Sequence, residues 1–115
     1  MMLPSRVVPK MQKFVPYNGK IADITDADTN KHTIDLETAL SETRKIIALI
    51  ITADRVAGTG ELGIYANEGS RRINLQIGSR WGMVTIADGT QRLQYDQGVA
   101  NDDYDLYCLG YVVEA

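Results

Sequence analysis

The sequence has few of the residues that usually carry catalysis or bind metals. It contains one cysteine, Cys108, and one histidine, His32. A lone cysteine excludes an intramolecular disulfide framework and a cysteine-based zinc site, and a lone histidine leaves one candidate general base with no specified partner. Because His32 alternates with Ile34 and Leu36, we expect it to face the core or an interface. No catalytic constellation stands out, so the sequence predicts a protein that is not an enzyme and that uses no cofactor.

Long apolar runs are also lacking. The longest one, residues 46–51, is far too short to span a bilayer, and residues 1–20 lack the continuous apolar stretch of a signal peptide. We therefore expect a soluble chain made in a reducing compartment, with no membrane partner. A length of 115 residues and a hydrophobic content of 44% fit one globular domain with its own core.

Acidic residues are missing from the first twenty positions, although the whole chain has a formal net charge of −3. Residues 1–20 hold four basic residues, whereas residues 21–115 hold eight basic and fifteen acidic ones. All three prolines also lie in the first segment, so it can form neither a helix nor a central strand. The sequence predicts an extended basic arm over 1–20 and one domain over 21–115. The residues behind this boundary are Arg6, Lys10, Lys13 and Lys20, with Pro4, Pro9 and Pro16.

After the arm, apolar and polar residues alternate with period two, which is typical of half-buried strands. One helical turn is expected over residues 37–42. Turn signals every 8–12 residues indicate a single antiparallel β-sandwich, jelly-roll-like, with about eight short strands. The expected strands are 21–24, 32–36, 44–53, 61–67, 72–77, 81–87, 92–96 and 104–113.

Two of these strands, 45–53 and 106–113, are apolar on both faces. In an antiparallel sheet a second apolar face is usually covered by other residues, because the face exposed to solvent is normally polar. The cover can come from the arm of the same chain, from a neighbour's arm or flat face, or from the domain's own loops or a short helix. We favour an intermolecular cover, and so expect a homo-oligomer. The expected interface residues are Val7, Val8, Phe14 and Val15 of the arm, and Tyr107, Leu109 and Tyr111 of the last strand.

Two motifs suggest ligands and have simpler explanations. Residues 58–63 match G-x-G-x-x-G, but the alternation that follows predicts a strand where a dinucleotide site needs a helix, so we interpret the glycines as a hairpin loop. Asp26, Asp28, Asn30 and Glu37 stand at the first, third, fifth and twelfth positions of a calcium-binding loop. Its sixth position is Lys31 instead of glycine, so we favour a polar turn and keep calcium as the alternative.

Nucleic acid is a poor partner for this composition, because the body is acidic and its basic residues form only a thin patch. A sugar-binding protein is a second possibility, since Trp81 and six tyrosines offer aromatic faces. Against it, Tyr107 and Tyr111 lie on the most apolar strand, where aromatic rings usually pack.

The order of features from about residue 35 to 113 resembles that of small β-sandwich proteins from tailed bacteriophage particles. It runs from "IDL" through "RKIIALIITAD", "GELGIYANEGS" and "LQYD" to "YDLYCLGYV". This resemblance implies a jelly-roll-like sandwich, often trimeric, whose N-terminal arm reaches a neighbouring subunit. Proteins of this kind decorate or cement capsids, or form parts of tails and fibres. The long Pro-rich basic arm has no counterpart among these motifs.

Together these features predict a non-enzymatic virion structural protein, a capsid decoration or cement subunit assembled in the host cytoplasm. Its expected partners are further copies of itself and the major capsid protein or another virion protein. The alternative is a glycan-binding or receptor-binding module of a tail fibre.

Overall fold

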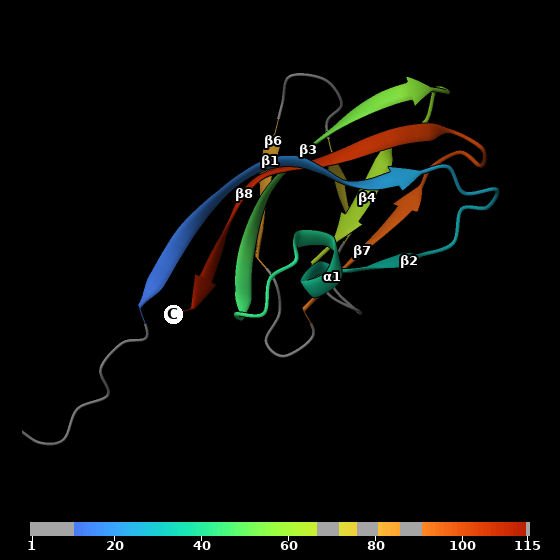
Figure 1. Cartoon of the computed structure of the whole chain (residues 1–115). Helices are drawn as coiled ribbons and strands as arrows, with labels where there is room; N and C mark the ends of the chain where they lie inside the picture. Colours follow the sequence, from blue (N-terminus) through green and yellow to red (C-terminus); the bar gives the residue numbers. More distant parts are fainter. Residues whose placement is uncertain (1–10, 67–71, 76–80, 86–90, 115) are drawn as a thin grey trace, which may run out of the picture.

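The structure, a computed structural model, describes residues 11–66, 72–75, 81–85 and 91–114. These residues form eight strands and one short helix, α1 (Figure 1). The predicted strand ends at 67, 76–77 and 86–87 lie outside the described residues. The elements are β1 (Gln12–Ile24), β2 (His32–Asp35), α1 (Leu36–Leu40), β3 (Ile46–Ala57), β4 (Leu62–Tyr65), β5 (Ile73–Leu75), β6 (Trp81–Thr85), β7 (Arg92–Gln97) and β8 (Asp103–Glu114).

The strands form two four-stranded antiparallel sheets, ordered β1-β8-β3-β6 and β2-β7-β4-β5. The pairs are nested along the chain: the first strand pairs with the last, β2 with β7, β3 with β6 and β4 with β5. The predicted all-β antiparallel architecture is thus confirmed. In the described part of the chain, no helix has the length and hydropathy needed to cross a membrane.

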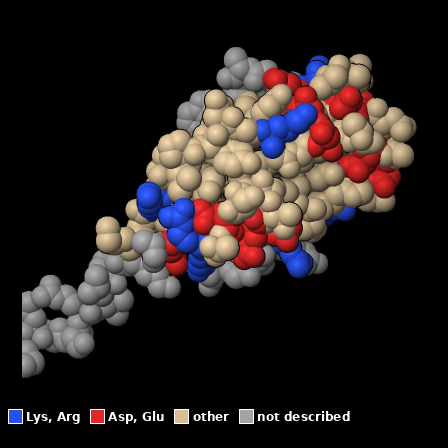
Figure 2. All heavy atoms as spheres, in the orientation of Figure 1, with Lys and Arg blue, Asp and Glu red and all other residues tan. Residues whose placement is uncertain are grey.

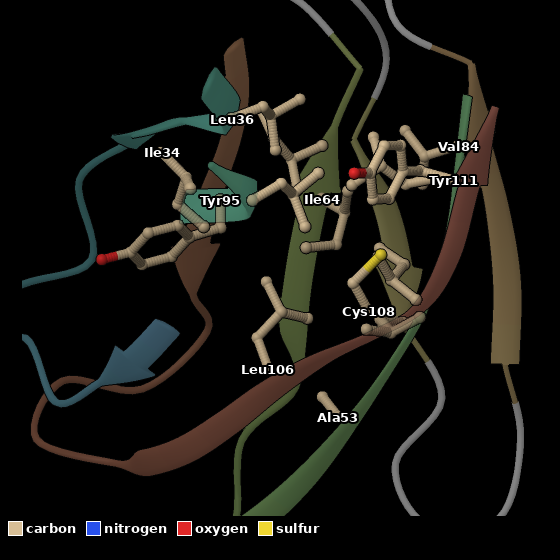
Figure 3. Close-up of a cluster of buried hydrophobic side chains, with 14 of the residues drawn as sticks. Ile34, Leu36, Ala53, Ile64, Val84, Tyr95, Leu106, Cys108 and Tyr111 are labelled. Carbon is tan, nitrogen blue, oxygen red and sulfur yellow. The ribbon is translucent and has the colours of Figure 1, made fainter. Parts of the chain in front are cut away.

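The core lies between the two sheets, where the inward side chains of both meet. Figure 3 shows Leu106 and Cys108 of β8 pointing toward Ile64 of β4. Burial raises the pKa of the Cys108 thiol to about 11, so the sulfur behaves as a small apolar group. Further members of the buried cluster are Ile24, Ile34, Leu36, Leu40, Ile46, Leu49, Ile51, Ala53, Leu62, Leu75, Val84, Leu93, Tyr95, Tyr104, Tyr111 and Val113.

The predicted boundary between arm and domain at residue 20 does not match the sheet. β1 begins at Gln12 and pairs with β8 of the same chain along its whole length, so residues 12–20 belong to the sandwich. Pro16 is tolerated because β1 is an edge strand. The Asn18-Gly19 turn signal marks an irregularity within the strand: the register shifts between Pro16 and Gly19, and Asn18 has a positive φ of 56°.

A bulge in β8 changes which side chains face the core. The adjacent residues Ile50 and Ile51 of β3 pair with Gly110 and Cys108, so Leu109 is an extra residue in β8 and the alternation changes phase there. Tyr111 consequently points inward (Figure 3) and is only 4% exposed. Val112, the next residue of the strand, is half-buried and faces outward. Strict alternation predicts that Tyr111 faces outward with Tyr107 and that Val112 faces the core. The prediction that Tyr111 is an outward interface residue is therefore wrong.

Helix α1 closes the gap between the sheets at one end (Figure 1). Asp35 caps it by accepting a hydrogen bond from Glu37 N, and Ser41 ends it in the left-handed conformation. Just beyond the helix, the buried Glu42 carboxylate accepts hydrogen bonds from the Arg44 guanidinium and from Tyr111 Oη at 2.9 Å. These contacts join the helix end to β8.

Acid is expected to weaken this junction. The Arg44 guanidinium lowers the pKa of Glu42 from 4.5 to about 2, although burial opposes the shift. The stabilisation is therefore complete above pH 4.5 and is lost as the pH falls through about 2. Thermal unfolding followed from pH 5 to pH 2 should show a smaller fall in Tm for Glu42→Gln than for the parent chain. The control Glu37→Gln removes an exposed carboxylate and should retain the parent's acid sensitivity; equal slopes for all three proteins would contradict the assignment.

Candidate functional site

The two sheets present different outer faces, and the β2-β7-β4-β5 sheet has the polar one. Tyr65 Oη donates a hydrogen bond to Asp96 Oδ2 at 2.8 Å, and Arg72 Nε donates to Asp96 Oδ1 at 2.6 Å. Lys31 Nζ lies 4.3 Å from the centre of the Tyr65 ring, a cation–π contact. The Gln94 amide donates to Thr33 Oγ1 at 3.3 Å. Such a face is suited to water.

The outer face of the β1-β8-β3-β6 sheet is apolar along its middle. We call this surface the apolar face; it consists of Phe14, Ile47, Ala48, Ile50, Tyr107, Leu109 and Val112. Phe14 is 49% exposed, and the other six side chains are half-buried. The Phe14 ring lies across Gly110, where an added Cβ would come within 2.3 Å of the ring. The chain thus covers part of the apolar face with its own first strand and leaves the rest in contact with solvent.

A row of aspartates crosses the same outer face at one end. Asp105 of β8 lies directly opposite Asp23 of β1 on one side and Asp54 of β3 on the other. Directly opposed residues share a face, and like charges in this arrangement repel. In Figure 2 acidic side chains lie at this end of the molecule, and others lie among basic side chains nearer the opposite end. We call Asp23, Asp105 and Asp54 the aspartate row.

Lys20 offsets part of the charge of the aspartate row. Its Nζ lies 2.8 Å from Asp23 Oδ1 and 3.6 Å from Asp105 Oδ1. The hydrogen bond from Lys20 lowers the pKa of Asp23, whereas a hydrogen bond with the Asp23 carboxyl, together with burial, raises the pKa of Asp105. Lys20 contacts two of the three carboxylates of the row, Asp23 and Asp105.

The structure separates the predicted interface residues into three groups. Phe14, Tyr107 and Leu109 lie on the apolar face. Val15 packs against the core and Tyr111 is buried in it, whereas Val7 and Val8 lie outside the described residues. Sequence reasoning missed the outward orientation of Val112 and the whole aspartate row. Only the pairing register reveals both features.

Two of the four residues of the calcium alternative, Asp26 and Asp28, lie 3.8 and 2.8 Å from His32 Nε2. Among the described residues there is no group of three His, Cys, Asp or Glu side chains placed to hold a metal ion, and Asp26, Asp28 and Glu37 are all described. Asp28 Oδ1 instead lies 2.8 Å from His32 Nε2 and accepts a hydrogen bond from Asn30 N at 3.0 Å. The His32 ring stacks on Tyr95 with 5.6 Å between centroids. These contacts make the segment a hydrogen-bonded polar turn.

Because His32 is the single histidine of the chain, its titration can be followed directly. The hydrogen bond to Asp28 raises the pKa of His32 above 6.5. Its stabilising effect is complete below pH 6.5 and is lost as the pH rises through the folded-state pKa. An NMR titration of the ring protons should give a pKa above 6.5, and Asp28→Asn should lower it. An unchanged value in Asp28→Asn, with Asp35→Asn as the matched control, would show that the pair does not form in solution.

The glycine motif lies in the connection between β3 and β4, which belong to different sheets, so the predicted hairpin loop is wrong. A buried aspartate holds this connection. Gly58 has a φ of 105°, and an added Cβ there would come within 1.9 Å of Asp102 Oδ1. Asp102 Oδ2 accepts hydrogen bonds from Gly60 N at 2.7 Å and from Tyr104 Oη at 2.9 Å. Strand β4 follows Gly58 and Gly60 and contains Gly63, as predicted from the alternation. The glycines therefore allow close packing against Asp102.

Comparison with known proteins does not assign the chain to a family: no family model, curated protein or solved structure matches it. Trp81, on which the sugar-binding alternative depends, begins β6, but its side chain lies outside the described residues.

Proposed function

We propose that this chain is a non-enzymatic structural subunit of a tailed-bacteriophage virion, of the capsid decoration or cement type. In this role the sandwich is a rigid block. Its apolar face packs against another subunit. The residues that precede β1, which include the basic Arg6 and Lys10, bind an acidic surface of a neighbour. The partners are further copies of the chain and the major capsid protein or another virion protein.

The observation that carries this proposal is the contrast between the two outer faces. A sheet that faces water alternates apolar and polar side chains, as the β2-β7-β4-β5 sheet does. The apolar face instead places Ile50, Tyr107 and Leu109 at the centre of the other sheet, with Phe14 largely exposed beside them. Contiguous apolar surface of this kind is typical of protein–protein contacts.

The nested strand pairing gives further support. Eight strands in two four-stranded sheets, with the first paired to the last, is the order expected of a jelly roll, a fold that recurs in viral capsid and lectin domains. This is an analogy at the level of the fold, and it fits both a capsid subunit and a lectin. The apolar face favours the subunit, because sugar recognition requires polar groups around an aromatic platform.

The virion assignment is tested by purifying virus particles from cells that produce the chain and quantifying it by mass spectrometry. We expect the chain at a fixed ratio to the major capsid protein, retained through a density gradient. Its absence from the particles would overturn the virion role. Specific binding of the isolated chain to a glycan array, abolished by Trp81→Ala, would favour the sugar-binding alternative.

A further inference from the structure

The His32 side chain lies where two connections between strands meet. Its Nε2 lies 2.8 Å from Asp28 Oδ1 and 3.8 Å from Asp26 Oδ1, and both aspartates belong to the connection between β1 and β2. The backbone oxygen of Asp26 accepts a hydrogen bond from Asn101 N at 2.9 Å, and Asn101 belongs to the connection between β7 and β8. Asp26 therefore lies beside His32 with its side chain and binds the β7–β8 connection with its backbone.

The groups around the His32 ring favour its charged form. Asp26 Oδ2 is buried and has no hydrogen-bond partner among the described residues, so a positive charge beside it offsets part of the cost of its burial. The Tyr95 ring of β7 stacks on the imidazole, and burial, followed by the nearby aspartates, raises the pKa of Tyr95, which keeps its hydroxyl neutral. The neighbouring cation in the chain, Lys31, has its Nζ 4.3 Å from the centre of the Tyr65 ring.

The charge of this cluster changes as His32 gains or loses its proton. The hydrogen bond to Asp28 raises the pKa of His32 above 6.5, and the same contact lowers the pKa of Asp28 below 3.8. Between pH 3.8 and 6.5 the ring is therefore positive and the Asp28 carboxylate negative. As the pH rises through the folded-state pKa of His32, the ring becomes neutral while the carboxylates keep their charge.

We infer that His32 is a pH-sensitive contact whose charged ring holds the β1–β2 connection and, through Asp26 and Asn101, the β7–β8 connection at this end of the sandwich. When the ring is neutral, it no longer offsets the carboxylates, and both connections open locally more often. Gly98, at the start of the same β7–β8 connection, donates instead to Glu61 O at 2.8 Å and should not respond. This inference does not depend on the proposed function.

The test is amide hydrogen exchange of the full chain, followed by NMR between about pH 5 and about pH 9, on either side of the His32 transition. Each rate is corrected for the intrinsic pH dependence of exchange. Protection of the Asn101 amide, which reports the bond to Asp26, should fall by a factor of about two to five, the range for a partly exposed ion pair. The midpoint should coincide with the pKa measured from the His32 ring protons, and protection at Gly98 should stay constant.

Two variants separate the charge of the ring from its presence. His32→Gln keeps an amide donor but gains no charge, so Asn101 should exchange at the parent's alkaline, corrected rate at every pH. Asp26→Asn keeps the backbone oxygen that accepts from Asn101 but removes the carboxylate, so the pH dependence should shrink and its midpoint should fall. Glu37→Gln, on exposed helix α1, is the matched control and should behave as the parent.

Three results would overturn the inference. The first is constant protection of Asn101 in the parent through the His32 transition, even if the Asn30 amide, which donates to Asp28 Oδ1, does respond. The second is a parent-like pH dependence in His32→Gln, which would assign the effect to another group. The third is an equal loss of protection at Gly98, which would show that the whole end of the sandwich loosens without a specific contact.

Discussion

Asp102→Ala is expected to lower the free energy of unfolding by about 3 kcal/mol, because two buried donors would lose a charged acceptor. Those donors are Gly60 N and Tyr104 Oη, which bond to Asp102 Oδ2 at 2.7 and 2.9 Å. Tyr104 is fully buried, and burial together with Asp102 raises its pKa to about 12, so its hydroxyl stays protonated and needs an acceptor. Urea denaturation gives the free-energy change directly.

Two neighbouring variants serve as controls for this effect. Tyr104→Phe removes one of the two donors and should cost about 1 kcal/mol. Asp103→Ala removes a half-buried carboxylate at the adjacent position and should change stability by less than about 1 kcal/mol. An Asp102→Ala protein as stable as Asp103→Ala would contradict the role given to Asp102 in holding the connection between β3 and β4.

Ile51→Ala and Ile50→Ala form a matched pair that distinguishes the two faces of β3. Ile51 is fully buried between the sheets, so its truncation leaves a cavity and should cost about 2–5 kcal/mol. Ile50 is half-buried on the apolar face, so the same truncation should cost the isolated domain about 1 kcal/mol or less. Self-association should show the opposite order, with Ile50→Ala the more damaging at a concentration where both proteins are folded.

The measurement for this pair combines urea denaturation at low concentration with sedimentation at high concentration. Equal losses of stability for the two variants would mean that Ile50 is buried within one molecule. The intermolecular role of the apolar face would then fail.

Much of the fold is encoded in local pattern. Period two and the turn residues predict the positions of β2 to β8 and the last four residues of β1, because a half-buried strand requires alternation and a tight connection favours glycine, asparagine or aspartate. The first part of β1 was not predicted. Three prolines and a turn-like Asn18-Gly19 made residues 1–20 resemble an arm, yet an edge strand accepts Pro16 and a bulge accommodates Asn18.

Less of the site can be read from the sequence. The sequence shows that β3 and β8 carry apolar side chains on both faces, and it correctly predicts that Tyr107 and Leu109 lie on the outer face. The bulge at Leu109 exchanges the expected faces of Tyr111 and Val112, and nothing in the local residues announces it. The aspartate row depends on the register of three strands distant in sequence, so only the tertiary pairing brings it together.

The central claim is that a second molecule covers the apolar face, and the mass of the intact chain in solution tests it most directly. Sedimentation equilibrium of the parent should give a multiple of the chain mass that falls to one chain in Ile50→Lys. The matched variant Thr33→Lys, on the polar outer face of the other sheet, should keep the parent mass. A parent chain that sediments as a single copy at the highest attainable concentration, with Ile50→Lys equally stable and equally monomeric, would contradict the account.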